Sequence, residues 1–284
     1  MVWRGDSRRP TPARAAIFLR EMIRHPLVVL GSMPGELAQR RRHQDYYRDS
    51  EADEEWDQHL HELLGAPWPC PERQPLTAVM EDVGELLAER GLEGGRYTYA
   101  WYSDAESSLG RAAWCAAVHA APSAVVETGV AHGVTTRIVL EALGQKGRGH
   151  LWSVDLPFPF DHRLHGQTGV AVPAACRERW TYVEGTSRKQ LPGVVQQAGQ
   201  VQLFIHDSLH TARNTLFEME QVASAMPAGG VMLVDDIKSH GGFSAFARRH
   251  REYRAIVAPS DDRVGMFGIA VRVADQTGLF TAYL

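Results

Sequence analysis

The chain has 284 residues, a length that suits one large α/β domain or a catalytic domain with a smaller appendage. Hydrophobic residues make up 44% and charged residues 23%, which excludes collagen-like, coiled-coil and wholly disordered chains. The net charge of −4 argues against nucleic acid as a partner. We expect no membrane span, because the sequence has no run of 18 apolar residues. Because the start lacks the apolar core of a signal peptide, we expect a cytoplasmic protein.

The cysteines provide a further exclusion. Cys70, Cys115 and Cys176 lie far apart in the sequence and form no CxxC pair. Their number and spacing therefore predict neither a zinc site of paired thiolates nor a disulfide framework.

Residues 1–95 are predicted to form a helical N-terminal extension, and residues 96–284 the main domain. Residues 1–50 carry ten arginines against five acids, whereas residues 51–93 carry twelve acids against two arginines. Solvated helix faces are the favoured explanation of these charges, and contact between the two blocks is the alternative. Helical patterns cover residues 12–30, 51–64 and 76–90.

Strand and helix patterns alternate after a capping box at Ser103 and Glu106, which begins a helix to about residue 119. The predicted strands are 124–127, 150–155, 180–184, 203–207, 230–235, 254–257 and 267–273. Helical segments between them begin near residues 134, 173, 187, 211 and 243. This alternation predicts a doubly wound, mostly parallel α/β sheet, and the short turn before the last strand predicts an antiparallel edge hairpin.

A turn with small residues follows the first predicted strand, in the pattern Glu127-x-Gly129-x-Ala131-x-Gly133. Small residues let the backbone approach a ligand closely. A nicotinamide fingerprint would need glycine where Ala131 and Val134 stand, and a P-loop would need a Gly-Lys-Ser/Thr sequence that is absent. A turn that binds no ligand is the alternative.

Acidic and hydroxyl side chains follow the next two predicted strands. Asp155 ends its strand 28 residues after Glu127, where a carboxylate can accept both hydroxyls of a ribose. A helix cap is the alternative for Asp155. Thr186 and Ser187 follow the third strand, and they contact a cofactor or simply cap the next helix.

The glycine-rich turn resembles motif I of the class I S-adenosylmethionine-dependent methyltransferases, with Ala131 in place of the usual central glycine. The resemblance implies a seven-stranded Rossmann-like sheet in the order 3-2-1-4-5-7-6 and S-adenosylmethionine as cofactor. The cofactor-binding residues that it implies are Glu127, Thr128, Gly129, Ala131, Gly133, Thr135, Thr136, Asp155, Gly185, Thr186, Ser187 and Asp207.

Three acids end the fourth and fifth predicted strands, which are neighbours in that sheet order: Asp207, Asp235 and Asp236. Carboxylates that converge in a cleft repel one another unless a proton or a cation neutralises them. Oxygen ligands of this type suit a hard ion, Mg²⁺ first or a similar divalent cation. The alternative is that Asp207 and Asp235 cap loops while Asp236 faces solvent.

The segments 205–211, 215–218 and 229–237 resemble the metal-dependent O-methyltransferases of natural-product sugar tailoring, of the macrocin and mycinamicin type, and their cephalosporin-hydroxylase-like relatives. The resemblance covers about residues 97–273. It implies that Asp207, Asp235 and Asp236 hold the metal and that His210 is the general base beside Asp207 in catalysis. Asp235 stands where the sugar enzymes often carry the longer Glu.

These observations together predict a Mg²⁺-dependent O-methyltransferase acting on a hydroxyl of a small natural product, for which a sugar or glycoside is one candidate. Its expected partners are a small hydroxylated acceptor and a second copy of the chain. Two alternatives stay open: a metal-independent small-molecule methyltransferase and a non-catalytic S-adenosylmethionine-binding partner protein. The long segment 157–173 is predicted to act as a lid over the site.

Overall fold

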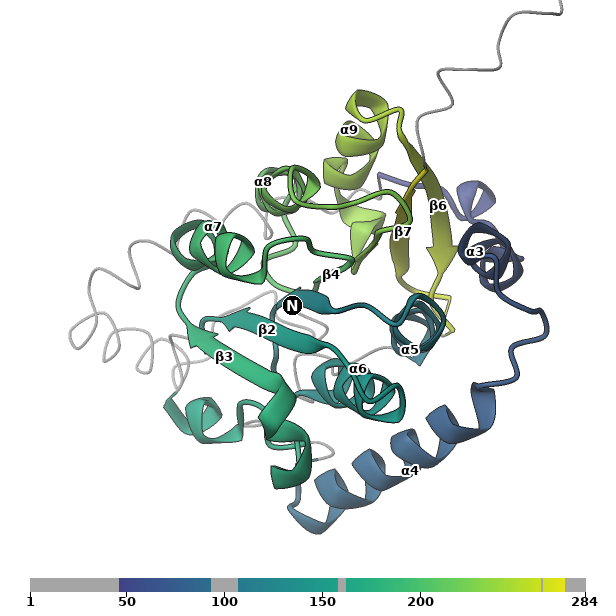
Figure 1. The fold of residues 1–284 in the computed structure, drawn as a ribbon. Helices are drawn as coiled ribbons and strands as arrows, with labels where there is room; N and C mark the ends of the chain where they lie inside the picture. The colour runs from purple at the N-terminus through teal and green to yellow at the C-terminus, as the bar shows by residue number, and fades with distance from the viewer. Residues whose placement is uncertain (1–45, 93–106, 158–161, 262, 274–284) are drawn as a thin grey trace, which may run out of the picture.

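The computed structural model describes residues 46–92, 107–157, 162–261 and 263–273 (Figure 1). The predicted helix at 12–30 and the capping box at 103–106 lie outside these residues. Among the described residues, no helix is long and apolar enough to cross a membrane.

A seven-stranded sheet in the order β3-β2-β1-β4-β5-β7-β6 forms the centre of the molecule. The strands are β1 (Ala124–Thr128), β2 (His150–Asp155), β3 (Trp180–Glu184), β4 (Leu203–His206), β5 (Val231–Val234), β6 (Tyr253–Pro259) and β7 (Met266–Arg272). The first five run parallel, and β7 pairs antiparallel with both β5 and β6. The predicted sheet order and the antiparallel edge hairpin are thereby confirmed.

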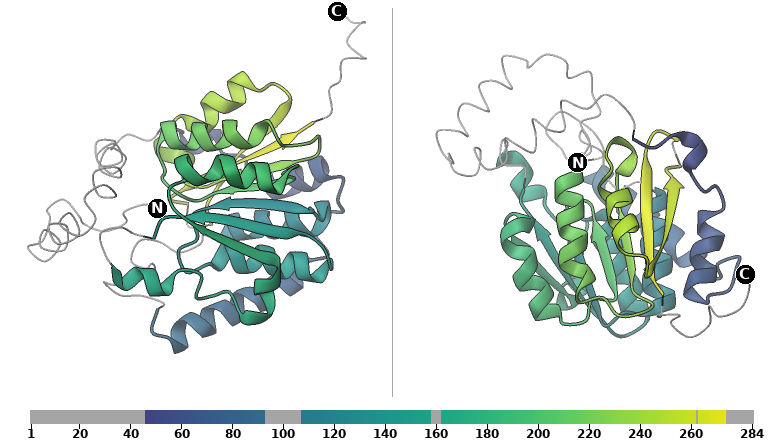
Figure 2. Two further views of the ribbon diagram at one scale, coloured as in Figure 1. Left: turned by 60° about the vertical axis from the view of Figure 1, so that its left-hand side comes forward. Right: turned by 90° about the horizontal axis from the view of Figure 1, so that it is seen from above.

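Helices cover both faces of this sheet (Figure 2). One layer contains α3 (Trp56–Leu64), α4 (Arg73–Glu89), α5 (Ser107–Ala120) and α6 (Val134–Gln145). The other contains α7 (Ser187–Ala198), α8 (Ala212–Ala223) and α9 (Gly242–Arg249). Short 3₁₀ helices are η1 (Asp49–Glu51), η3 (His162–Gln167), η4 (Ala174–Arg179) and η5 (Ile237–Ser239). The segment after residue 173, predicted as a helix, is therefore a 3₁₀ turn.

Alternate side chains of the central strands supply the two halves of the core. Val125 packs with the α5 and α6 layer, whereas its neighbour Val126 packs with the α7 and α8 layer. All five residues of β1 are buried, as expected for a parallel strand covered on both faces. The apolar residues at the start of this strand, Ala124 to Val126, are the reason that it could be recognised in the sequence.

The described part of the N-terminal region packs directly on this core. Trp56 of α3 meets Phe267 of β7 edge to face, with ring centroids 5.1 Å apart. Leu76, Val83 and Leu87 form the buried face of α4 and join the same cluster as β1. Burying a large apolar side chain contributes about 1.5–3 kcal/mol. Residues 46–92 are therefore held to the sheet by apolar contacts.

Candidate active site

The glycine-rich turn after β1 packs closely against the start of the loop after β4. Gly129 has φ +87°, and a Cβ atom there would lie 1.9 Å from the carbonyl oxygen of Asp207. Gly133 has φ +84° and caps α6. Ala131 also adopts a left-handed conformation, with φ +49°, at a cost of about 1–2 kcal/mol for a residue with a Cβ atom. The turn is thus built for close approach, and it stores some strain where related motifs have glycine.

Glu127 occupies a buried position below this turn. Its Oε2 accepts hydrogen bonds from Thr136 (2.8 Å) and Ser153 (2.6 Å). Among the described residues, neither its buried Oε1 nor the buried hydroxyl of Thr135 has a hydrogen-bond partner. Burial raises the pKa of Glu127 to about 7. Buried polar atoms that lack a partner are rare and mark positions where a ligand or a water binds, so these two atoms fit a polar cofactor group.

Asp155 lies beside the turn at the carboxyl end of β2. Burial raises its pKa to about 7, although hydrogen bonds from the backbone amides of Ala131, Leu156 and Val130 act in the opposite direction. The Gly185 amide donates to the Asp155 carbonyl oxygen at 2.8 Å, which ties the turn after β3 to this strand end. Asp155 therefore faces the glycine-rich turn, as ribose recognition requires.

The predicted residues after β3 begin α7. Thr186 is the N-cap residue, but its side chain makes no capping hydrogen bond. Its carbonyl oxygen accepts from the amides of Lys189 and Gln190, both at 3.0 Å. Ser187 is the first helical residue, and its hydroxyl lies 3.5 Å from Oδ1 of Asn214. The Thr186 hydroxyl is therefore not used by the helix, which removes one of the two explanations given for it.

Residues 167–171 lie over the glycine-rich turn. The amide of Gly169 donates to the Ala131 carbonyl at 2.9 Å, and the amide of Ala171 donates to the His132 carbonyl at 2.8 Å. The His132 ring is 3.1 Å from the Gln167 amide oxygen. The described part of the predicted lid thus contacts the cofactor turn directly.

Asp207, His210 and Asp235 come together at the carboxyl ends of β4 and β5. One ligand atom from each lies within 4.8 Å of those of the other two. His210 Nε2 is 3.7 Å from Asp207 Oδ1, and His210 Nδ1 is buried without a hydrogen-bond partner among the described residues. Burial, together with the carboxyl of Asp235, holds the pKa of Asp207 well above its usual value. Two ionised carboxyl groups this close repel each other, and a proton or a cation relieves that repulsion.

The structure does not bring Asp236 into this group. Asp236 adopts a left-handed conformation, with φ +52°, and is the N-cap residue of η5. The cluster therefore pairs two of the three predicted acids with His210, which was predicted as a base. A site with two carboxylates and one imidazole is less selective for Mg²⁺ than an all-oxygen site, and it also accommodates Mn²⁺.

A buried acid that sequence reasoning missed supports both halves of the site. Glu218 of α8 is fully buried, and its two oxygens accept four hydrogen bonds from Thr128 (2.6 Å), His206 (2.6 Å), Ser208 (2.8 Å) and Asn214 (2.7 Å). Burial raises its pKa, but His206 and these hydrogen bonds outweigh burial and hold it below the usual value. The available signal was a charged residue on the face of α8 that also carries Met219 and Val222.

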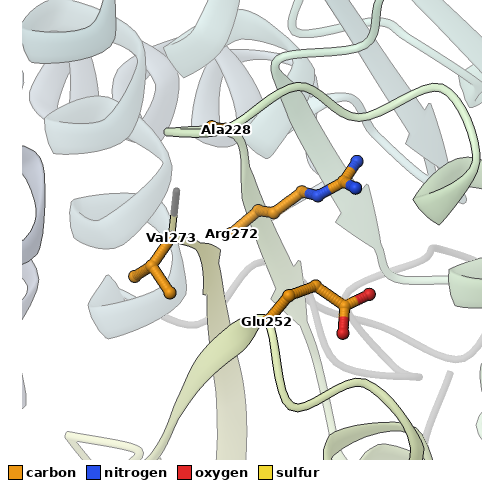
Figure 3. Close-up of a pocket in the computed structure, with 4 residues that line it drawn as sticks. All are labelled: Ala228, Glu252, Arg272 and Val273. Atoms are coloured by element: carbon orange, nitrogen blue, oxygen red, sulfur yellow. The ribbon is translucent and has the colours of Figure 1, made fainter. Parts of the chain in front are cut away.

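A pocket lies near the amino-terminal ends of the parallel strands, at the end of the sheet opposite the acid cluster (Figure 3). Its lining residues are Ala228, Glu252, Arg272 and Val273. Arg272 ends β7, which runs antiparallel to β5, so this pocket faces away from the acid cluster. None of the predicted site residues lines it.

Comparison with known proteins supports this arrangement. The model of a methyltransferase domain family matches residues 126–237. A candidate O-methyltransferase from Klebsiella pneumoniae is 15% identical, with a TM-score of 0.50, and covers 78% of this chain and 97% of its own. An O-methyltransferase from Bacillus cereus, solved with S-adenosylhomocysteine, is 13% identical and has a TM-score of 0.51. The match covers 77% of this chain and 97% of that chain.

A methyltransferase from Podospora anserina, also bound to S-adenosylhomocysteine, is 10% identical, with a TM-score of 0.50, and covers 69% of this chain and 88% of its own. Comparison with curated proteins gives no match. Residues 126–237 thus match a methyltransferase domain family, and the seven-stranded sheet around them has the order that the resemblance to class I S-adenosylmethionine-dependent methyltransferases implied.

Proposed function

We propose that this chain transfers a methyl group from S-adenosylmethionine to a hydroxyl of a small natural product, with a divalent cation, Mg²⁺ first, held by Asp207 and Asp235. The observation that carries the proposal is the cluster of Asp207, Asp235 and His210 directly beside the glycine-rich turn. Because Gly129 packs against the Asp207 backbone, the methyl donor and the acidic cluster share one edge of the sheet. A sugar or glycoside is the acceptor class that the sequence resemblance favours.

The reaction forms an O–CH₃ bond as the S–CH₃ bond breaks, and the sulfonium receives the electron pair of the broken bond. A divalent cation, when bound, lowers the pKa of the acceptor hydroxyl. His210 takes the hydroxyl proton, because its Nδ1 has no hydrogen-bond partner among the described residues. Asp207, 3.7 Å from the other ring nitrogen, then stabilises the imidazolium. Such a base contributes about 10²–10⁴-fold to the rate.

The acid pair also supports the proposed cation. Burial and the neighbouring carboxyl of Asp235 raise the pKa of Asp207, and a cation bound between the two carboxyls would relieve their repulsion. Carboxylate oxygens are the ligands that Mg²⁺ and Mn²⁺ prefer, and substrate hydroxyls or waters complete such sites. The rival function is a metal-independent methyltransferase in which this acid pair, with its shared proton, binds the acceptor by hydrogen bonds.

The test combines methyl transfer with cation binding. Labelled S-adenosylmethionine is incubated with a panel of glycosides and phenols, before and after EDTA treatment and with Mg²⁺ or Mn²⁺ restored. Mn²⁺ binding is measured separately by electron paramagnetic resonance. We expect D207N and D235N to lose Mn²⁺ binding, whereas D236N, whose left-handed backbone asparagine tolerates, keeps it.

Each outcome separates the candidates. Full activity after EDTA treatment would establish the metal-independent rival. Cofactor binding without transfer to any acceptor, together with no bound Mn²⁺, would favour a non-catalytic binding protein. An H210Q variant should keep its cofactor affinity and lose about 10²–10⁴-fold in rate.

A further inference from the structure

Four metal-ligating side chains gather at the other end of the molecule from the acidic cluster. They come from three separate segments: His61 of α3, Cys70 of the loop before α4, and Cys115 and His119 of α5. One ligand atom from each of His61, Cys70 and His119 lies within 4.8 Å of the others. Because α5 ends just before β1 begins, this cluster lies at the amino ends of the parallel strands, away from the cofactor turn.

The spacing of three ligand atoms matches a tetrahedral site. Zinc binds sulfur at about 2.3 Å and imidazole nitrogen at about 2.0–2.1 Å, so a tetrahedron places two sulfurs about 3.8 Å apart and a sulfur and a nitrogen about 3.5 Å apart. Cys70 Sγ lies 3.8 Å from Cys115 Sγ and 3.4 Å from His119 Nε2. Both separations agree with those of ligands around one ion.

His61 supplies an independent observation. Its side chain is fully buried, and Nδ1 lies 2.6 Å from the carbonyl oxygen of Asp57. A carbonyl can only accept, so Nδ1 carries the proton and Nε2 keeps its lone pair. That Nε2 is buried, and no described residue forms a hydrogen bond with it. Metal-bound histidines usually donate their other ring nitrogen to a carbonyl or carboxylate in this manner.

We propose that His61, Cys70, Cys115 and His119 form a structural zinc site that fastens the α3–α4 segment to α5. Two thiolates and two imidazoles suit Zn²⁺, and four protein ligands leave no open position for a substrate. This proposal departs from the sequence-based expectation, which rested on the spacing of the cysteines alone. The ligands are paired in space by the packing of α3 and its following loop on α5, and only Cys115 and His119 have a recognisable i, i+4 spacing.

The experiment uses the full chain, purified with reductant, in wild-type form and as C70S, H119Q and C176S. Cys176 lies outside the cluster, next to Glu141, and C176S is the matched control. Zinc content is measured by mass spectrometry of the metal, and Co²⁺ replaces zinc for absorption spectroscopy. Cys70 and His119 are only partly buried, so we expect both substitutions to leave the fold intact. The affinity for S-adenosylmethionine, which the proposed function places at the carboxyl ends of the strands, reports whether each variant still folds.

We expect about one more equivalent of zinc in wild type and C176S than in C70S and H119Q. A thiolate-to-cobalt charge-transfer band should appear only in the first pair, and it excludes the acidic cluster because that cluster has no cysteine. Chelation should lower the melting temperature of wild type more than that of C70S, because both proteins keep the acidic cluster and only wild type has the proposed zinc site. Equal zinc contents without the band would overturn the proposal, and so would a Cys70–Cys115 disulfide in metal-free protein.

Discussion

Replacing Glu218 with alanine tests whether the buried acid holds the ends of β1 and β4 together. The carboxylate accepts from Thr128 at the end of β1, from His206 at the end of β4, and from Ser208 and Asn214. Gly129 and Asp207 directly follow these two strand ends. Losing the Glu218 hydrogen bonds should therefore also disturb the candidate active site.

The magnitude follows from these partners. Breaking a buried ionic pair by removing one member costs about 3–5 kcal/mol, because the other member stays buried without compensation. The hydroxyls of Thr128 and Ser208 can rotate to new acceptors, whereas the His206 ring is fully buried and fixed. We therefore expect Glu218→Ala to lower the free energy of unfolding by about 3–5 kcal/mol, a large part of the stability of a typical domain.

The assay is urea unfolding followed by circular dichroism, with Glu220→Ala as the matched control. Glu220 lies on the same helix but is partly exposed and pairs with Arg249 and His250 at the surface, so its loss should cost less than about 1 kcal/mol. A loss below about 1 kcal/mol for Glu218→Ala would refute the reasoning, because it would mean that the four donors find other partners.

The pH dependence of unfolding provides a second test of the same group. The folded-state pKa of Glu218 lies below its unfolded value, so its stabilisation is present above the unfolded pKa and is lost as the pH falls through the folded pKa. Glu218→Gln should therefore reduce the acid sensitivity of the protein below about pH 4.5. An unchanged acid limb in this variant would contradict the lowered pKa.

Two further predictions concern the cofactor edge. Gly129→Ala places a Cβ atom 1.9 Å from the Asp207 carbonyl oxygen, at a φ of +87°. Calorimetry should then show a loss of S-adenosylmethionine binding. The free energy of unfolding should fall by more than about 1–3 kcal/mol. Gly144→Ala, in the open helical position of α6, should be neutral or slightly stabilising, and equal behaviour of the two variants would contradict the close approach. Because burial raises the pKa of Asp155 to about 7 and ribose hydroxyls need the carboxylate, cofactor affinity should fall up to about tenfold per pH unit below 7 and level off above 8. Asp155→Asn should flatten this profile, and an affinity independent of pH in the wild type would rule out the role given to Asp155.

The sheet was predictable because each central strand is a short apolar run that ends in a polar residue. The boundaries of β2 and β3 agree with the sequence patterns to the residue, and the other strands agree within two residues. The segment from residue 174 differs because it forms a short 3₁₀ helix before β3, and periodicity over six residues does not separate 3₁₀ from α.

The site was predictable where a residue directly follows a strand and unpredictable where a residue comes from elsewhere. Asp207 and Asp235 follow β4 and β5, so the parallel strand order alone brings them together. Asp236 follows Asp235 in the sequence, but it is the left-handed N-cap residue of η5 and is not one of the three residues of the cluster. Glu218 and the His61 cluster depend on how helices pack across tens of residues, which no local pattern encodes.

Hydrogen-bond satisfaction separates supporting groups from ligand-facing groups at this edge. Glu218 is fully buried, and both of its oxygens have protein partners, so it has no capacity left for a ligand. Glu127 Oε1, Thr135 Oγ1 and His210 Nδ1 are also buried, yet each lacks a hydrogen-bond partner among the described residues. An unsatisfied buried polar atom costs about 1–3 kcal/mol. Under the proposed function, a bound cofactor and acceptor would supply the missing partners.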